Sequence, residues 1–255
     1  MLALISPAKT LDPAPSRLAL PATRPAFVEQ ANQLAALLKS HSETELAALL
    51  GISPALARLN AERFREFSTD DHPPHAKHAA ALYRGDTYDG LDVDSWTPED
   101  WQFAQGSLRI LSGLYGLLRP LDGIQPYRLE MSSKLTNPAG KDLYPFWGQR
   151  LSRAVTAEAT THDDSTVIHL ASEAYIKAVP GIPLLTPVFL ETRPEGLKVI
   201  ALLAKQARGA MARFLVTRRL TSPEPLKTFN ERGYRFREEL STAGRWVFVR
   251  EQSGS

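Results

Sequence analysis

The chain has 255 residues, of which 43% are hydrophobic and 23% are charged, and its net charge is +2. These are the values of a globular protein that can build a real core, and its apolar runs are far shorter than the ~18 residues that span a membrane. The absence of cysteine excludes disulfides, thiol peroxidase chemistry, cysteine-ligated zinc and iron–sulfur clusters. Because the net charge is small, any attraction to nucleic acid must come from local basic patches.

The first half of the chain is predicted to be mostly helical after one buried strand. The strand covers residues 2–5, and a proline-rich loop over 6–24 places Lys9 and Thr10 just beyond the strand end. Apolar periodicity and capping residues then predict, in order, helices over 27–38, 43–50 and 54–67, a polar loop over 69–78, a turn-rich segment over 83–91, and a helix from 98 to about 115.

The second half mixes strands and helices without a regular order. The predicted elements are a helix over 142–159, a strand over 167–170, a short helix that begins at Ser172, strands over 184–190 and 197–203, a helix over 204–219, and strands over 234–236 and 245–249. No glycine-rich phosphate loop follows any strand. We therefore expect one mixed α/β (α+β) domain over residues 1–255.

The segment from Leu108 to Met131 combines charges, aromatic rings, glycines and prolines among apolar residues. An ordinary amphipathic helix keeps its charges on one solvated face, whereas these charges continue into a glycine- and proline-rich stretch. This composition favours a rigid, partly buried polar site in which arginine forks hold an anion. The expected members of this polar cleft are Arg109, Arg119, Tyr127 and Arg128.

Residues 43–67 carry the pattern of a helix–hairpin–helix. Leu46, Leu49, Gly51, Ile52 and Ala57 fall on its register. In such a motif the glycine permits a tight turn, and the second helix points its free N–H groups at a DNA phosphate. The expected DNA contacts are Gly51, Ile52 and Ser53, with Arg58 and Arg63 nearby. Two positions depart from the motif, since Ser53 replaces its second glycine and Asn60 an apolar residue, so an ordinary αα-hairpin is the alternative.

The segment from Gly196 to Pro223 holds six basic residues and no acid. A charge run is usually a solvated face, but this excess also predicts a surface that binds phosphate groups. The candidate DNA contacts on it are Lys205, Arg208, Arg213, Arg218 and Arg219. Gly209 in the same helix indicates a close approach of another backbone.

Metal and hydrolase signatures are weak. Residues 70–78 contain three histidines and two aspartates, but two prolines prevent the i, i+4 spacing that a helix would give the ligands. We expect a solvated loop, no metal site and no bound cofactor, and we expect His169 to be a core histidine. Neither a G-x-S-x-G elbow nor an H-E-x-x-H helix is present.

The chain closely resembles the YaaA family of bacterial peroxide-stress proteins. The matching segments are Ser6 to Thr10, 83–91, 108–131, 140–147, 169–179, 204–214 and 229–236. The resemblance implies a cytoplasmic protein of unusual mixed fold that lowers free iron and limits oxidative DNA damage, with a DNA-binding helix–hairpin–helix and a basic cleft. His169 and Ala174 depart from the family pattern, which has Asn and Glu at these positions.

The sequence is compatible with two functions. The first is non-sequence-specific binding of duplex or branched DNA without turnover. The alternative is an enzyme that acts on a phosphorylated or nucleotide-like small molecule, with Lys9, Asp86, Glu130 and Lys141 as catalytic candidates and Asp86 or Glu130 as general base. The same polar residues are also compatible with buried ion pairs that fix the fold. Direct iron sequestration is disfavoured, because no E-x-x-H pair is present.

Overall fold

The central sheet has four strands in the order β6-β5-β1-β8. The computed structural model describes residues 1–14, 18–70, 73 and 75–251. In it, β1 (Leu2–Ile5) pairs in parallel with β5 (Leu108–Ser112) on one side and with β8 (Val167–Leu170) on the other, and β6 (Gly116–Leu118) is antiparallel to β5. All residues of these strands are buried, as expected of parallel strands that are covered on both faces.

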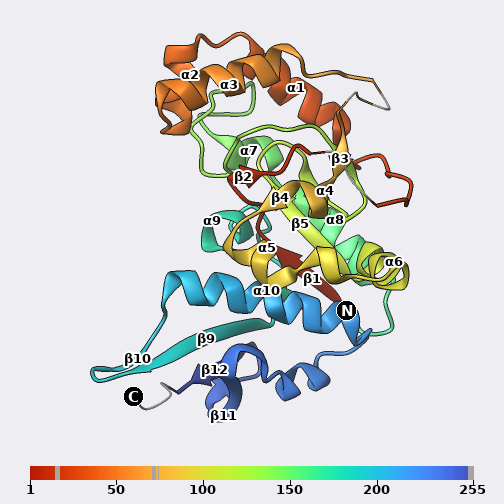
Figure 1. The fold of residues 1–255 in the computed structure, drawn as a ribbon, viewed down its shortest axis with the longest axis vertical. Helices are drawn as coiled ribbons and strands as arrows, with labels where there is room; N and C mark the ends of the chain where they lie inside the picture. The colour runs from red at the N-terminus through yellow and green to blue at the C-terminus, as the bar shows by residue number, and fades with distance from the viewer. Residues whose placement is uncertain (15–17, 71–72, 74, 252–255) are drawn as a thin grey trace.

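A second four-stranded sheet lies beside the first, with a long helix between them (Figure 1). The helix α10 (Ala201–Thr217) contacts β1 and β8 of the first sheet and β9 of the second. The strands of the second sheet, in the order β10-β9-β12-β11, are β10 (Gly196–Lys198), β9 (Thr186–Arg193), β12 (Arg245–Arg250) and β11 (Tyr234–Thr242). β9 and β12 are parallel, and the other neighbours are antiparallel.

Three helices form the opposite end of the molecule in Figure 1. They are α1 (Val28–Lys39), α2 (Glu43–Leu50) and α3 (Pro54–Arg65), and α3 packs against the other two. The remaining helices are α4 (Ala79–Leu82), α5 (Asp86–Leu91), α6 (Pro98–Ser107), α7 (Leu143–Trp147), α8 (Arg150–Ala159) and α9 (Glu173–Ile176). Two short ladders join β2 (Thr10–Leu11) to β4 (Tyr83–Arg84) and β3 (Lys77–His78) to β7 (Gly123–Ile124).

The predicted mixed α/β class is confirmed, but the long helix from 98 to about 115 is wrong. The helix α6 ends at Ser107, and Leu108–Ser112 is the strand β5 instead. Its pairing with the fully buried β1 outweighs the helical periodicity that continues through this segment. The strand β5 is therefore an inner strand of the sheet, and Arg109 lies inside it.

Two further boundaries differ from the predictions. The expected helix over 142–159 is interrupted at Gly148, whose φ of +51° and ψ of −123° end α7 before α8 begins. The expected strand over 197–203 is also wrong, because β10 ends at Lys198 and α10 begins at Ala201. The segment over 83–91, predicted to be turn-rich, contains β4 and the helix α5.

The helices α5 and α10 touch through glycines. A Cβ built on Gly209 would lie 1.8 Å from the backbone oxygen of Thr87, and one built on Gly90 would lie 2.1 Å from the backbone oxygen of Gln206. The close approach that the sequence indicated at Gly209 is confirmed. It brings the first turn of α5 against the middle of α10, where Lys205 and Arg208 lie.

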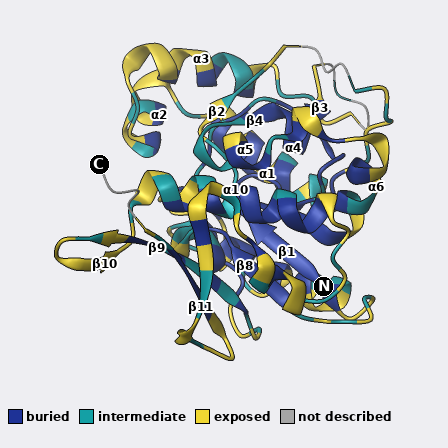
Figure 2. Ribbon diagram, turned by 60° about the horizontal axis from the view of Figure 1, so that its bottom comes forward, coloured by how far each residue is buried: buried dark blue, intermediate teal, exposed yellow. Residues whose placement is uncertain are grey.

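The buried residues join the layers into one core (Figure 2). In that view β1 is dark blue along its length, whereas the tip at β10 and the turn after β11 are exposed. Among the described residues, no helix is long and apolar enough to cross a membrane.

Candidate functional site

A pocket opens where the chain leaves the carboxyl ends of β1 and β8. Its volume is about 420 Å³, and we call it the cationic pocket. In sheets with parallel strands, ligands bind beyond these strand ends. Five segments that lie far apart in the sequence form its walls: residues 6–10, 84–87, 127–132, 170–175 and 205–208. Its charged lining residues are Lys9, Arg84, Asp86, Arg128, Glu130, Lys205 and Arg208.

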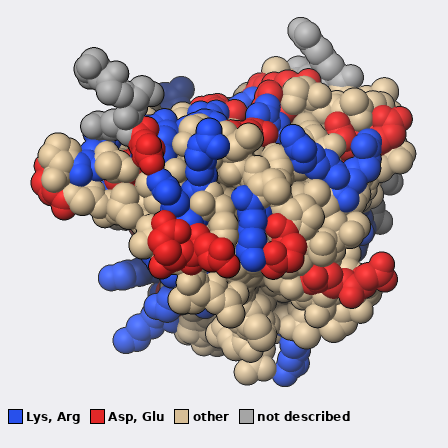
Figure 3. Space-filling view, turned by 90° about the horizontal axis from the view of Figure 1, so that it is seen from below, with Lys and Arg blue, Asp and Glu red and all other residues tan. Residues whose placement is uncertain are grey.

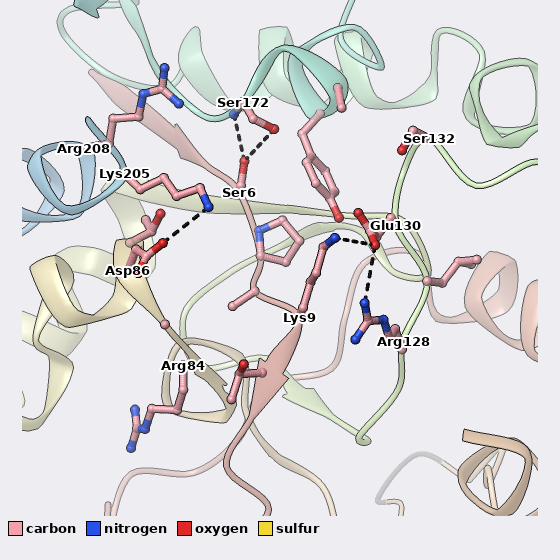
Figure 4. Close-up of a pocket in the computed structure, with 18 of the residues that line it drawn as sticks. Ser6, Lys9, Arg84, Asp86, Arg128, Glu130, Ser132, Ser172, Lys205 and Arg208 are labelled. Atoms are coloured by element: carbon pink, nitrogen blue, oxygen red, sulfur yellow. Dashed lines mark hydrogen bonds and ion pairs between the residues drawn. The ribbon is translucent and has the colours of Figure 1, made fainter. Parts of the chain in front are cut away.

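The two strand ends are tied together at the base of the pocket by a pair of serines. The backbone N–H of Ser172 donates to Ser6 Oγ at 2.8 Å, and the two hydroxyl oxygens lie 3.4 Å apart (Figure 4). Tyr88 donates its hydroxyl to the Ser6 carbonyl at 3.1 Å. These contacts fix the loops after β1 and β8, on which the polar lining depends.

One side of the pocket is a cluster around Glu130. Its Oε1 accepts from Lys9 Nζ at 3.0 Å and lies 3.8 Å from the guanidinium of Arg128. Figure 4 shows both cations joined to this carboxylate by dashed lines. Arg128 Nε is buried and has no hydrogen-bond partner among the described residues. One carboxylate therefore faces two cations, and the cluster keeps a positive excess.

The opposite side of the pocket is formed by α5 and α10. Lys205 Nζ lies 3.3 Å from Asp86 Oδ2. Arg208, one turn further along α10, makes no hydrogen bond or ion pair to any described residue, and Figure 4 shows its side chain apart from the Asp86–Lys205 pair. Burial lowers the pKa of the Arg208 guanidinium, while the Glu173 carboxylate raises it. A half-buried arginine without a partner is a ready donor for an anionic ligand.

A layer of tyrosines lies beneath the pocket. Tyr127 OH lies 2.6 Å from both Tyr83 OH and Ser112 Oγ, and the backbone N–H of Tyr115 donates to the same serine. Burial raises the pKa of Tyr127 to about 12, so its hydroxyl stays protonated at neutral pH. This layer makes the pocket floor rigid and uncharged.

The structure divides the predicted polar cleft. It gathers two predicted cleft members, Tyr127 and Arg128, around one cavity with the catalytic candidates Lys9, Asp86 and Glu130. The other two members lie elsewhere, because Arg109 is buried against Glu158 and Arg119 pairs with Asp122 at 3.3 Å. The fourth catalytic candidate, Lys141, is exposed outside the pocket. Arg109 and Arg119 therefore serve the fold as ion pairs.

Only some of the basic residues predicted to bind phosphate in the 196–223 segment lie at the cationic pocket. Lys205 and Arg208 line the cationic pocket, whereas Arg213 is held by Asp92 at 3.2 Å and Glu231 at 2.7 Å. Arg219 pairs with Asp100 at 3.4 Å, and the Arg218 guanidinium stacks 4.5 Å above the Phe214 ring. Carboxylates from distant segments thus neutralise basic side chains that have no acidic neighbour in their own segment. On the face seen from below, Figure 3 shows blue and red side chains interspersed.

The helices α2 and α3 form a compact hairpin. Gly51 ends α2 with φ +60° and ψ +47°, and Ser53 caps α3 by accepting from the N–H of Leu56 at 3.4 Å. Ala57 is fully buried, as close packing of two helices requires. These contacts are also those of an ordinary αα-hairpin, so DNA contact here is a proposal.

Two arginines expected to aid this hairpin have local restraints. Arg58 pairs with Glu62 at 3.4 Å on the exposed face of α3. Arg63 is half-buried, and burial lowers the pKa of its guanidinium. Neither residue lines the cationic pocket.

A second cavity connects the hairpin to the cationic pocket. It has a volume of about 440 Å³, and residues 48–51 of α2 and its turn form one wall. The other wall consists of Glu130 and residues 132–134, and Glu130 and Ser132 also line the cationic pocket. The turn at Gly51 and the cationic pocket therefore lie on one continuous surface.

Among the described residues, no cluster of three or more His, Cys, Asp or Glu side chains has the arrangement of a metal site. Of the histidine-rich loop, Asp71, His72 and Pro74 lie outside the described residues. His169 is a core histidine, only 5% exposed and with its Nδ1 3.4 Å from Thr186 Oγ1, but its buried Nε2 has no hydrogen-bond partner among the described residues. Pocket residues to which the sequence assigned no role include Ser6, Arg84, Ser132, Ser172 and Tyr175. All of these except Ser132 lie inside the matching family segments.

His169 should make the protein less stable in acid. Its burial lowers its pKa below the ordinary value of 6.5, and the nearby charge of Arg208 acts in the same direction, against that of Glu173. The neutral, buried imidazole of His169 contributes its full stability above the pKa that it has in the unfolded chain. This contribution is lost as the pH falls through the lower pKa that it has in the folded protein. We expect the drop in Tm between about pH 7.5 and about pH 5.5 to be smaller in His169→Asn than in the wild type. Equal drops would contradict this assignment.

The fold and the site define a mixed α/β protein with a cationic pocket at the edge of its central sheet. Residues 1–240 match the family model described as peroxide stress protein YaaA. A UPF0246 protein of Magnetococcus marinus is 47% identical over 254 residues, covering 98% of this chain and 99% of that protein. The chain belongs to the YaaA family of peroxide stress proteins.

Proposed function

We propose that this peroxide stress protein binds DNA without sequence preference, and so limits iron-dependent oxidative damage to it. The observation that carries the proposal is the continuous surface between the turn at Gly51 and the cationic pocket, which share Glu130 and Ser132 as a wall. A duplex or branched DNA backbone following this surface meets the start of α3 and then the cations of the pocket.

Two physical arguments support phosphate contacts along this surface. The turn is exposed at Gly51 and Ser53, and the first N–H groups of α3 favour an anion there. Lys205 and Arg208 then provide positive charge at the pocket. Arg213 and Arg219 do not line the cationic pocket and hold carboxylates of this chain, so the proposal assigns the principal contacts on α10 to the two pocket residues, Arg208 and the Asp86-paired Lys205.

The hairpin contribution can be tested with two double variants that differ only in charge. Gly51→Asp with Ser53→Asp places two carboxylates at the turn, and Gly51→Asn with Ser53→Asn is the neutral control. Asn and Asp both tolerate the left-handed conformation of residue 51 and both cap helices, so the fold should persist in each. We expect the Asp variant to bind DNA at least about tenfold more weakly than the Asn variant. The DNA affinity of the wild type and of the Asn variant should fall steeply with salt concentration.

The measurement is fluorescence anisotropy with duplex and four-way-junction DNA across a salt series, with folding checked by circular dichroism. Equal affinity of the two double variants would remove the hairpin from the proposal. Loss confined to the Asp variant would support it.

The size and charged lining of the pocket favour a second candidate, an enzyme that acts on a phosphorylated or nucleotide-like small molecule. Asp86 and Glu130 each lie beside a lysine in a cavity of about 420 Å³, a volume typical of small-ligand sites. Either carboxylate has the chemistry of a general base. Absence of DNA binding at moderate salt, together with turnover of such a compound that Glu130→Gln abolishes, would favour the enzyme instead.

A further inference from the structure

We propose that the cationic pocket receives a terminal phosphate, a phosphomonoester, in contrast to the internal phosphodiesters of a continuous duplex. This inference rests on the proposed DNA binding and specifies what the pocket adds to it. A strand end inserts its phosphate between Arg208 and Lys205, while the adjoining backbone runs over the shared wall toward the turn at Gly51.

The size of the pocket is the first reason. A cavity of about 420 Å³ belongs to the range of small-ligand sites and has no room for a double helix. The backbone of a continuous duplex can touch only its rim. A strand end, or a free nucleotide, has a phosphate that is attached on one side only and can enter.

The charge of the pocket is the second reason. Five cationic and two carboxylate side chains line it, an excess of three positive charges before outside partners are considered. Arg84 is largely neutralised by Asp12 and Asp94, which leaves an excess of two around Lys9, Arg128, Lys205 and Arg208, partly offset at Arg208 by the nearby Glu173 carboxylate. A phosphomonoester carries about −1.5 to −2 charges at neutral pH and three acceptor oxygens, whereas a phosphodiester carries a single charge.

Unsatisfied donors are the third reason. Arg208 has no ion-pair or hydrogen-bond partner among the described residues, and Arg128 Nε is buried without an acceptor. A buried donor without an acceptor costs free energy that a bound anion would recover. Ser6 and Ser172 add hydroxyl groups at the base of the pocket.

The inference fits the setting of peroxide stress. Oxidation of deoxyribose breaks DNA strands and leaves phosphorylated ends, which an intact duplex lacks. A protein that combines a non-specific backbone contact at the hairpin with a pocket for the terminal phosphate would concentrate at such breaks.

The test compares short duplexes whose ends carry hydroxyl, 5′-phosphate or 3′-phosphate groups, with anisotropy as the readout. We expect at least one phosphorylated duplex to bind about tenfold more tightly than the hydroxyl-ended duplex. Arg208→Gln should abolish this preference, and Arg208→Lys should retain part of it because the charge remains but the bidentate fork is lost. Arg153→Gln, which removes an exposed positive charge on α8 outside the pocket, is the matched control and should retain the full preference.

The outcomes separate this inference from the proposed function. Equal affinity of the wild type for all ends would overturn the inference while leaving DNA binding intact, and no binding to any duplex would overturn the proposed function itself. Calorimetric titration with thymidine monophosphate, with thymidine as control, then distinguishes the source of the phosphate. Binding of the monophosphate that is lost in Arg208→Gln supports a phosphomonoester pocket that also takes free nucleotides, and no binding beside an intact preference for phosphorylated duplex ends assigns the pocket to strand ends alone.

Discussion

Gly209→Ala is expected to lower the free energy of unfolding by at least about 3 kcal/mol. The added Cβ would lie 1.8 Å from the Thr87 oxygen and 2.8 Å from the Leu91 nitrogen, and both are backbone atoms that no side-chain rotation can move. The helices α5 and α10 must therefore separate. Ala has a higher helix propensity than Gly, so propensity alone would make the variant more stable. A large loss of stability must therefore come from the contact between α5 and α10.

Gly106→Ala is the matched control for this prediction. Gly106 also lies in a helix, α6, but a Cβ built on it meets no atom within 4 Å. We expect this variant to be neutral or slightly more stable, by up to about 1 kcal/mol, because Ala restricts the unfolded chain. Urea unfolding of both variants measures the difference, and an unchanged midpoint for Gly209→Ala would show that α5 and α10 are not locked together.

The same variant links the core to the site. Lys205 and Arg208 are carried by α10, and Asp86 is the first residue of α5. The two helices form one wall of the cationic pocket, so their separation moves Asp86 away from Lys205 and Arg208. We therefore expect the folded fraction of Gly209→Ala to lose affinity for phosphate groups even though no charge has changed.

Local sequence signals predicted the elements whose structure is decided locally. The buried strand over 2–5 and the helices near 28–39, 43–50 and 54–65 are recognisable because periodicity and caps coincide. The strand β5 was missed because its five consecutive buried residues include Arg109 and directly continue a helix. Its conformation is decided by β1, more than 100 residues earlier, and no local signal reports that pairing.

The candidate site was predicted in parts and not as a whole. Lys9, Arg128 and Glu130 were recognised as polar residues in unusual places, but their shared cavity depends on loops that follow distant strands. The role of Arg208 changed most. It was predicted to be one of several equivalent cations on α10, whereas the structure gives Arg213 and Arg219 internal partners and gives Arg208 no hydrogen bond or ion pair to any residue that it describes.

Arg250→Met is expected to destabilise the second sheet by about 3 kcal/mol, because it leaves a buried carboxylate without its cation. The Glu191 side chain is 2% exposed, its Oε2 accepts from Arg250 Nε at 2.8 Å, and its Oε1 accepts from Tyr234 OH. All three residues are in register, since Arg250 of β12 lies opposite Glu191 of β9 and Tyr234 of β11. Met keeps much of the apolar stem of Arg250, so the loss reports mainly the missing charge.

The double variant Arg250→Met with Glu191→Gln decides whether that explanation is right. Glutamine keeps an acceptor for Tyr234 and removes the unpaired charge, so most of the lost stability should return in urea unfolding. A double variant no more stable than Arg250→Met alone would mean that the arginine acts through packing.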